Sequence, residues 1–445
     1  MAETKIIVLD DDPTGSQTVH SCLLLTRWDV DTLKDALLDS APLFFVLTNT
    51  RGMSAEAAAE ITAEVCHHLQ KALDDLAAAG QPLQPVMVSR SDSTLRGHYP
   101  VETDVIADAM GPFDAHFLVP AFFEGGRVTR DGVHYLMVDG EPVPVHETEF
   151  ARDSVFGYSH SYMPDYVEEK TAGRVIADEV EHFTLADVRG DCLARLRALA
   201  NNTCCVVDAE VQSDLDHFCS QLMQAAGEGK RFLFRSAASL LTALAQLPPQ
   251  PVAAAEMRRY VRGGRPGAVL AGSHVKKTTD QLEQLFKEPD VAAIEVDVAR
   301  IPEERDTLLD AVMNKVEQHH AAGRGVVIYT SRVELTFPGQ AQRLAFGEQV
   351  SAFLMDVVRR LPADLGFLIS KGGITSNDVL SDGLALRTSR VLGQILPGCS
   401  VVRCPDDHAR FPGMPVVIFP GNVGDEDAVA VVYRRLSGPA AEAAA

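Results

Sequence analysis

The sequence lacks an apolar run that approaches the length of a membrane span, and no basic and apolar leader precedes its first strand-like segment. It also lacks a basic block: 62 acidic and 40 basic residues leave a net charge of −22. This balance argues against nucleic acid or an anionic membrane as a partner. We therefore expect a cytoplasmic, soluble protein that binds any anion through local Arg, Lys and backbone N–H groups.

Motifs for metal and dinucleotide binding are absent as well. The eight cysteines include an adjacent pair, Cys204-Cys205, but no CxxC spacing. They are typical of reduced thiols rather than of a zinc site or a disulfide framework. No segment matches a Walker A loop or the GxGxxG fingerprint. The missing fingerprint disfavours a dinucleotide-dependent dehydrogenase.

Strand-like and helix-like segments alternate over most of the 445 residues, which is typical of α/β layering. The length and the Pro- and Gly-rich stretches at 247–251 and 262–267 predict two domains. We expect an N-terminal domain over residues 1–245 and a C-terminal domain over residues 265–438. Each should be an α/β domain with a mainly parallel sheet, and the two domains should face each other across a cleft.

Three consecutive carboxylates, Asp10, Asp11 and Asp12, follow the first strand-like segment, and a Pro-Thr-Gly turn that contains Thr14 comes next. Ligands of an open α/β sheet bind just beyond the carboxyl ends of its strands. Because three adjacent carboxylates repel one another, a cation, a bound hydroxyl or a shared proton is their natural partner. The alternative is a solvated acidic turn.

Two further strand ends in the first half carry arginines. One precedes Arg51, and the other leads through Arg90 into a loop that contains Asp92, Ser93 and Arg96. Arginine suits a carboxylate, and Asp and Ser suit hydroxyls, so the mixture indicates a site for a polyhydroxy acid. A surface loop is the alternative. Residues 129–170, which show little periodicity, predict a long functional loop.

The second half carries glycine turns at its strand ends. Gly272-Ser273, Gly372-Gly373-Ile374-Thr375 and Pro420-Gly421 all follow strand-like segments. Backbone N–H groups and a helix N-terminus at such turns form an anion site. Thr375 with Asp378 also resembles a capping box, so the alternative role of Thr375 is to begin a helix.

A substrate half and a phosphate half together suggest phosphoryl transfer from a nucleotide. A haloacid-dehalogenase-like phosphatase that uses Asp10 and Asp12 is one rival, since Asp-x-Asp-x-Thr after a strand fits its first motif. That class leaves the glycine turns of the second half unexplained. A non-catalytic sugar-acid sensor is the rival from outside enzymology, and it also leaves those turns idle.

The chain resembles the four-carbon acid sugar kinase family, whose members phosphorylate acids such as threonate, erythronate and 3-oxo-tetronate with ATP. Six landmarks occur in the family's order over nearly the whole chain. They are Asp11-Asp12-Pro13-Thr14-Gly15, Asp92-Ser93-Thr94-Leu95-Arg96-Gly97, Pro120-Ala121-Phe122-Phe123-Glu124-Gly125-Gly126-Arg127, Gly272-Ser273, Gly372-Gly373-Ile374-Thr375 and Gly421-Asn422-Val423-Gly424.

The resemblance implies a sugar-acid-binding N-terminal domain and a nucleotide-binding C-terminal domain. ATP contacts then fall on Ser273, on Gly372, Gly373, Ile374 and Thr375, and on Gly421. The chain departs from the family pattern in three places. Arg90 replaces a lysine, Ile374 replaces an aspartate within the glycine turn, and the opening DDDPTGSQTVH differs from the usual ADDLTGA. These departures indicate a subgroup whose substrate need not have four carbons; branched five-carbon acids such as 3-oxo-isoapionate remain open.

Our hypothesis for the chemistry assigns each candidate residue a role. Asp11, Asp12 or Asp92 orients or deprotonates the attacking alcohol, and Mg²⁺ bridges the ATP phosphates with Lys371 as an additional cation. Residues of the first half bind the acid: Thr14, Arg51, Arg90, Ser93 and Arg96. The metal ligands and the identity of the acid stay open at this point, and a homodimer is the default expectation for the oligomeric state.

Overall fold

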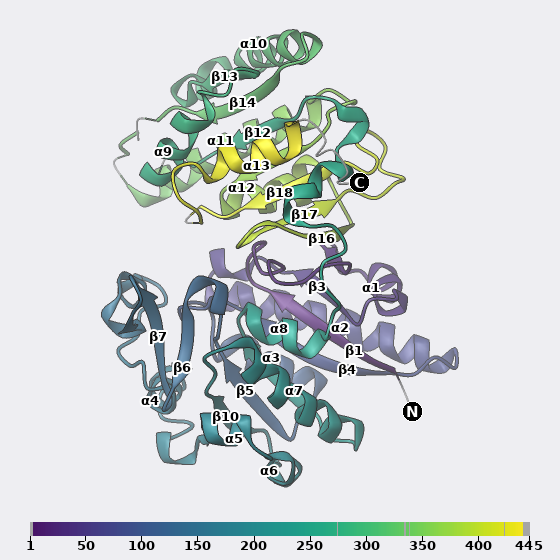
Figure 1. The fold of residues 1–445 in the computed structure, drawn as a ribbon, viewed down its shortest axis with the longest axis vertical. Coiled ribbons are helices and arrows are strands. Elements are labelled where there is room, and N and C mark those ends of the chain that lie inside the picture. Colours follow the sequence, from purple (N-terminus) through teal and green to yellow (C-terminus); the bar gives the residue numbers. More distant parts are fainter. Residues whose placement is uncertain (1–2, 274, 333–334, 338, 422, 439–445) are drawn as a thin grey trace, which may run out of the picture. The chain divides into compact units, whose positions relative to one another are not determined.

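The computed structural model describes residues 3–273, 275–332, 335–337, 339–421 and 423–438. The chain divides into two compact units, residues 1–248 and 249–445, and each is an α/β structure (Figure 1). This is the predicted fold class. No helix within these described ranges has both the length and the apolar character required to cross a membrane.

The first unit contains an eight-stranded sheet in which every neighbouring pair runs parallel. Its strand order is β2-β3-β1-β4-β11-β5-β10-β9. The strands are β1 (Glu3–Asp10), β2 (Leu23–Leu25), β3 (Leu43–Leu47), β4 (Leu83–Arg90), β5 (Ala115–Val119), β9 (Glu181–Phe183), β10 (Thr203–Val207) and β11 (Phe232–Ser236). Most of the central strands are buried on both faces, as their near-continuous apolar sequences require.

Helices cover both faces of this sheet. On one face, α1 (Val30–Leu38), α2 (Ala55–Ala78) and α3 (Val101–Met110) share an apolar cluster with alternate strand residues. On the other face, Phe218 of α7 (Gln212–Gly227) packs edge-on against Phe117 of β5. The remaining helices of this layer are α5 (Leu185–Arg189), α6 (Leu193–Ala198) and α8 (Ala238–Ala245).

The order of the strands locates the edge at which a ligand should bind. The chain leaves β1 toward β2 and β3 on one side and leaves β4 toward β5 on the other, although β1 and β4 are neighbours. Such a topological switch point opens a crevice beyond the carboxyl ends of the two strands. The predicted acidic turn follows β1, and the predicted substrate loop follows β4.

Residues 127–170, which we call the insertion, form regular structure instead of the predicted loop. β6 (Arg127–Arg130), β7 (Val133–Val138) and β8 (Glu141–Pro144) make a three-stranded antiparallel sheet, and α4 (Met163–Lys170) follows. The prediction of a long loop was wrong because these strands are short and only partly buried, so they carry little hydrophobic periodicity.

The second unit contains a seven-stranded sheet of order β13-β14-β12-β15-β18-β17-β16. Its first five strands are parallel, and β17 and β16 extend the sheet in antiparallel fashion. The strands are β12 (Ala268–Ala271), β13 (Val291–Val296), β14 (Gly325–Thr330), β15 (Leu368–Lys371), β16 (Thr388–Leu396), β17 (Cys399–Arg403) and β18 (Pro415–Phe419). Here the switch point lies between β12 and β15, which end beside the first two glycine turns.

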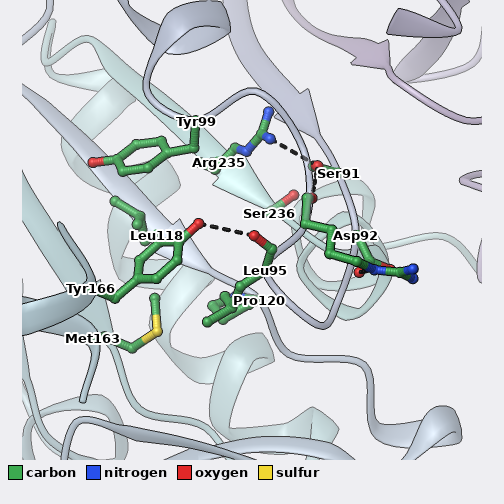
Figure 2. Close-up of a pocket in the computed structure, with 11 residues that line it drawn as sticks. Ser91, Asp92, Leu95, Tyr99, Leu118, Pro120, Met163, Tyr166, Arg235 and Ser236 are labelled. Carbon is green, nitrogen blue, oxygen red and sulfur yellow. Dashed lines mark hydrogen bonds and ion pairs between the residues drawn. The ribbon is translucent and has the colours of Figure 1, made fainter. Parts of the chain in front are cut away.

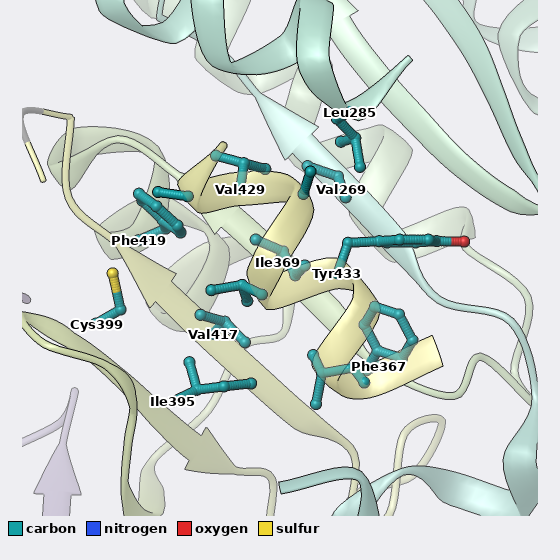
Figure 3. Packing of buried hydrophobic residues seen from close by; sticks show 14 of the residues in the cluster. Val269, Leu285, Phe367, Ile369, Ile395, Cys399, Val417, Phe419, Val429 and Tyr433 are labelled. Atoms are coloured by element: carbon teal, nitrogen blue, oxygen red, sulfur yellow. The ribbon is translucent and has the colours of Figure 1, made fainter. Parts of the chain in front are cut away.

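Five helices of the second unit flank this sheet: α9 (Lys276–Leu285), α10 (Ile301–Ala321), α11 (Gln340–Arg360), α12 (Gly373–Asp378) and α13 (Ala428–Ser437). α9 and α13 pack on the sheet around Val269, Ile369, Val417 and Tyr433 (Figure 3). All eight cysteines of the chain are buried and free, which agrees with the expected reduced thiols.

Candidate functional site

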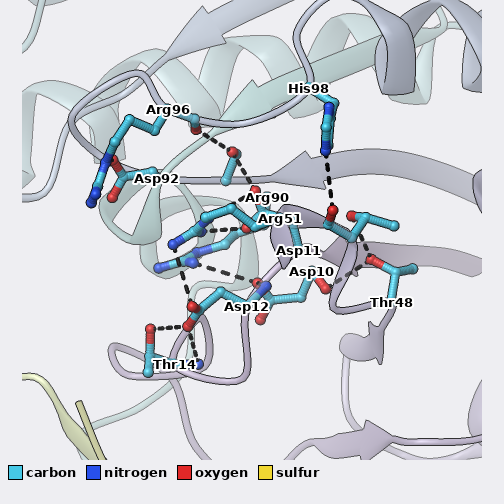
Figure 4. A network of polar contacts seen from close by, with 12 residues as sticks. Asp10, Asp11, Asp12, Thr14, Thr48, Arg51, Arg90, Asp92, Arg96 and His98 are labelled. Carbon is cyan, nitrogen blue, oxygen red and sulfur yellow. Dashed lines mark hydrogen bonds and ion pairs between the residues drawn. The ribbon is translucent and has the colours of Figure 1, made fainter. Parts of the chain in front are cut away.

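Three strands that are adjacent in the first sheet, β3, β1 and β4, deliver polar residues to one edge (Figure 4). Asp10 ends β1 opposite Arg90, which ends β4. Arg51 lies in a short 3-10 turn (Thr50–Gly52) after β3. The sequence-predicted residues Asp11, Asp12, Arg51 and Arg90 therefore converge at the switch point of the sheet.

Arg51 is held by two of the three adjacent carboxylates. Its Nε donates to Asp11 Oδ2 at 3.2 Å, a second guanidinium nitrogen pairs with Asp11 Oδ1, and Nη1 lies 3.4 Å from Asp12 Oδ2. Asp11 Oδ2 also accepts from Ser91 Oγ at 2.6 Å. Asp11 is thus buried and fully engaged in orienting Arg51, which keeps a side chain one-fifth exposed.

Asp12 differs from Asp11 because its carboxylate reaches solvent. Its side chain is 22% exposed, and Oδ1 accepts from the Thr14 backbone N–H at 2.9 Å and from Thr14 Oγ1 at 2.5 Å. Burial alone would raise the pKa of Asp12, but Arg51 and the hydrogen bonds from Thr14 outweigh it and lower that pKa. Asp12 is therefore an ionised acceptor that a substrate hydroxyl can reach.

Asp92 and Arg96 form a second acid–base pair in the loop after β4. Asp92 Oδ2 accepts from Arg96 Nε at 2.8 Å and from the Thr94 hydroxyl. Burial opposes ionisation of Asp92, yet Arg51 and Arg96 hold its pKa well below the usual range. The guanidinium of Arg96 lies 4.9 Å from the centre of the Phe150 ring, which orients it from the insertion. The side chain of Ser93 is nearly buried in the same loop.

Asp10 and Arg90 lie beneath these groups. Asp10 is fully buried, its Oδ1 is 3.5 Å from Arg90 Nη1, and burial raises its pKa to about 8 against the opposing charge of Arg90. A methyl group on Gly15 would come within 1.9 Å of Asp10 Oδ2, so the turn closes directly over this carboxyl. A buried neutral carboxyl is unsuited to be the nucleophile that a phosphatase would require.

A hydrogen-bonded relay behind Asp11 contains residues that the sequence did not predict. Arg235, at the end of β11, donates to Glu102 Oε2 at 2.6 Å, to Ser89 Oγ at 2.7 Å and to Ser91 Oγ at 2.8 Å. The Ser91 hydroxyl in turn donates a hydrogen bond to Asp11 Oδ2. The one available signal was an arginine directly after the apolar residues Phe232, Leu233 and Phe234 of the strand, since no sequence spacing links it to Glu102.

The second unit brings its three glycine turns together. Gly372 N–H donates to Phe419 O at 2.8 Å, which joins the turn after β15 to the end of β18. A methyl group added to Gly272 would lie 2.8 Å from Thr375 Oγ1, and one added to Gly372 would lie 3.9 Å from Ser273 Cβ. Ser273, Gly372, Thr375 and their neighbours thus share one edge of the second sheet.

Lys371 links the end of β15 to the turn after β18. Lys371 is the last residue of β15. Its buried Nζ donates to Pro420 O at 2.6 Å and to Gly421 O at 3.1 Å, and lies 4.4 Å from the Phe419 ring centre. Burial lowers its pKa to about 8. Lys371 therefore sets the path of the turn that contains Gly421.

The turn after β15 leads into the N-terminus of a helix. α12 begins at Gly373, and its N-cap Gly372 has φ +113° and provides no side-chain cap. The first N–H groups of a helix have no partner within that helix and are potential donors. Thr375 is the third residue of α12, so the alternative in which it caps the helix was wrong. Ile374 is 79% exposed. Gly421 faces open space, and Asn422 of the predicted GNxG turn lies outside the described residues.

These donors fit the phosphates of a nucleotide. The described residues contain no cluster of three metal-ligating side chains. Magnesium in phosphoryl-transfer sites is held mainly by phosphate oxygens, water and one or two carboxylates, so a magnesium–nucleotide complex remains compatible with this edge.

Two different family models match the chain, one within each compact unit. Residues 6–244 match a family model described as a sugar-binding N-terminal domain, and residues 268–429 match one described as a nucleotide-binding C-terminal domain. A D-erythronate kinase of Heliobacterium modesticaldum is 25% identical over 96% of this chain and 95% of its own. A D-threonate kinase of Bordetella bronchiseptica is 31% identical over 35% of this chain and 37% of its own.

Two solved structures share the fold over the full length. A Salmonella typhimurium LT2 protein, provisionally described as a tRNA synthase, superposes with a TM-score of 0.69 at 18% identity, covering 98% of both chains. A Haemophilus influenzae protein of a family described as a domain of unknown function gives a TM-score of 0.64, also at 18% identity, covering 97% of this chain and 100% of its own. At this identity the likeness shows the fold alone.

Proposed function

Because the chain belongs to the four-carbon acid sugar kinase family, we propose that it transfers the γ-phosphoryl group of ATP to a hydroxyl of a small sugar acid. The acceptor class comprises four-carbon acids such as threonate, erythronate and 3-oxo-tetronate, and branched five-carbon acids such as 3-oxo-isoapionate. We assign binding of the acid to residues 1–245 and binding of ATP to residues 265–438. The relatives named as erythronate and threonate kinases support this class of acceptor.

One observation carries the proposal: Arg51 is fixed by Asp11 beside an ionised, accessible Asp12 and next to the Asp92–Arg96 pair. A sugar acid presents a carboxylate and several hydroxyls. The guanidinium groups of Arg51 and Arg96 supply donors for the carboxylate, while Asp12 and Asp92 supply acceptors for hydroxyls. Thr14 and Ser93 lie in the same two turns, and Arg90 pairs with Asp10 at the ends of the strands that precede these turns.

Phosphoryl transfer asks the protein chiefly for positioning and for neutralisation of charge. Asp12 accepts a hydrogen bond from the attacking hydroxyl and takes its proton as the bond to phosphorus forms. Its lowered pKa makes it a weak base, which suits a loose transition state in which the proton leaves late. Asp92, tied to Arg96 and Thr94, orients a second hydroxyl.

In the second unit, the backbone N–H groups of Gly373, Ile374 and Thr375 bind the phosphates, and Gly372, whose own N–H is bonded to Phe419 O, turns the chain into them. Ser273 and Gly421 border the same edge, and Lys371 holds the latter turn in place. Bound Mg²⁺ supplies neutralisation of the phosphate charge. The γ-phosphorus and the acceptor hydroxyl must meet, so the reaction requires a state of the protein in which the two sites come together.

An ATP-dependent ADP-release screen across a panel of sugar acids tests the proposal. We expect release of ADP with at least one four- or five-carbon acid and none with the corresponding neutral sugars. Binding of ATP without ADP release from any acid would instead favour a non-catalytic sensor. For the oligomeric state we predict a homodimer, and for the cellular compartment we predict the cytoplasm.

A further inference from the structure

No residue of the insertion, residues 127–170, is assigned a contact with a reactant, but the insertion contacts the loop that carries Asp92 and Arg96. We call residues 91–97 the substrate loop. The aromatic and apolar side chains of the insertion surround this loop in one buried cluster that contains Leu95, Tyr158, Met163 and Tyr166. Figure 2 shows Leu95 beside Tyr166 and Met163, with Ser91 and Asp92 on the polar side of the same pocket.

Three successive backbone carbonyls of the substrate loop each accept a hydrogen bond from a different side chain of the insertion. His134 Nε2 lies 2.8 Å from Ser93 O. The Tyr158 hydroxyl donates to Thr94 O at 2.7 Å, and the Tyr166 hydroxyl donates to Leu95 O at 3.0 Å. The insertion therefore fixes the loop backbone at three consecutive residues.

The tautomer of His134 follows from its partners. A carbonyl oxygen can only accept, so Nε2 carries the proton, and Nδ1 accepts from Thr129 Oγ1 at 2.9 Å. Burial lowers the pKa of His134 to about 4, which keeps the ring neutral near pH 7. His134, Tyr158 and Tyr166 are all buried, so each hydrogen bond is shielded from water.

The substrate loop needs such support because its conformation is unfavourable by itself. Leu95 adopts φ +67°, a left-handed conformation that a leucine rarely takes. That conformation turns the Leu95 side chain into the cluster of the insertion. Meanwhile Asp92, Thr94 and Arg96 bond to one another through their side chains. The backbone carbonyls of the loop thus bond to the insertion, and its polar side chains remain in the site.

We propose that His134, Tyr158 and Tyr166 are positioning residues, which hold the substrate loop in the conformation that binds the sugar acid. This inference rests on the proposed function for its kinetic consequence. Removal of one donor leaves a buried carbonyl unpaired, so the loop relaxes to restore its hydrogen bonding. We therefore expect weaker binding of the acid and unchanged binding of ATP.

Tyr158→Phe and Tyr166→Phe test the proposal, because each removes one hydroxyl and keeps the ring. We expect the KM for the acid to rise roughly tenfold in each variant, as loss of a buried hydrogen bond implies, with the KM for ATP unchanged. His134→Gln retains a donor and should stay closer to wild type than His134→Ala. Amide hydrogen exchange of residues 92–97, measured without substrate, should become faster in both tyrosine variants.

Tyr99→Phe is the matched control. Tyr99 lines the same pocket and stacks on Tyr166 with ring centres 6.0 Å apart, but its hydroxyl lies near Cys204 Sγ at 4.0 Å and not near the loop. Tyr99→Phe should at most lower the melting temperature, and should leave the KM for the acid and the exchange of residues 92–97 unchanged.

Equal KM and equal loop exchange in the Tyr99, Tyr158 and Tyr166 variants would overturn the positioning role. If wild type phosphorylates no acid, the proposed function fails, and the exchange measurement still decides whether the insertion orders the loop.

Discussion

Asp10, Asp11 and Asp12 are adjacent in sequence but differ in their hydrogen-bond partners, and Asp12 differs from the other two in its exposure. Asp10 is buried and unpaired at one oxygen, Asp11 is saturated by Arg51 and Ser91, and Asp12 is accessible. The sequence could predict that a site lies here, because acids follow a buried strand. It could not rank the three, because their partners Arg51, Ser91 and Arg90 come from strands whose register only the folded sheet sets.

Asp12 is the residue whose loss should act on chemistry alone. We expect Asp12→Asn to lower kcat by roughly two to four orders of magnitude, the usual contribution of a general base or orienting group. The asparagine keeps the shape of the side chain and can still accept from Thr14. ATP affinity, measured by calorimetry, should stay within about twofold, since the glycine turns belong to the other unit. Unchanged kcat would remove Asp12 from the mechanism.

Protonation of Asp10 should make the stability of the fold depend on pH. Its pKa of about 8 in the folded protein lies above the value near 3.9 of an unfolded chain. Between these values the folded state holds a proton that the unfolded state has lost, so this contribution to stability falls as the pH rises from about 4 to about 8. Asp10→Asn removes the titration. Its unfolding midpoint in urea should therefore change less between pH 5 and 8 than that of wild type, and equal pH dependence would contradict a buried neutral Asp10.

At the scale of elements, strand ends were predictable and hairpins were missed. The predicted parallel strands are present because each is a short, almost wholly apolar run. The low periodicity of residues 129–170 predicts a loop, although Asp131-Gly132 and Asp139-Gly140 are turn signals for tight hairpins. All four of these residues have positive φ, as a type I′ turn requires. A search for such dipeptides would have found β6, β7 and β8.

The turn after β18 offers a test of the phosphate edge. A methyl group on Gly421 meets nothing within 4 Å, so Gly421→Ala should leave the melting temperature of the protein without ligand within about 1 °C of wild type, as surface substitutions do. If a phosphate approaches this backbone, the same methyl group should weaken ATP binding at least several-fold. Gly227→Ala, which also faces open space at the end of α7, is the control. Normal ATP affinity in Gly421→Ala would exclude close contact of the nucleotide with this turn.

At the scale of the whole molecule, the proposed function requires each unit to bind its own substrate. The Pro-rich stretch at residues 247–251 predicts a linker, and the boundary between the two compact units falls between Pro248 and Pro249. A net charge of −22 repels anionic substrates in general, so recognition depends on local donors. In the proposed sites, these donors are arginines aligned by carboxylates in the first unit and backbone N–H groups in the second.

Hydrogen exchange can separate the two binding events in the intact protein. A nonhydrolysable ATP analogue alone should slow amide exchange at residues 372–376, which include the first turn of α12, and should leave residues 91–97 unchanged. The sugar acid alone should do the reverse. Asp12→Asn should keep the ATP response in full, because that carboxylate serves only the acceptor. Protection of residues 91–97 by the ATP analogue alone would show that the nucleotide orders the acid site, and would replace independent binding by an ordered sequence in which ATP binds first.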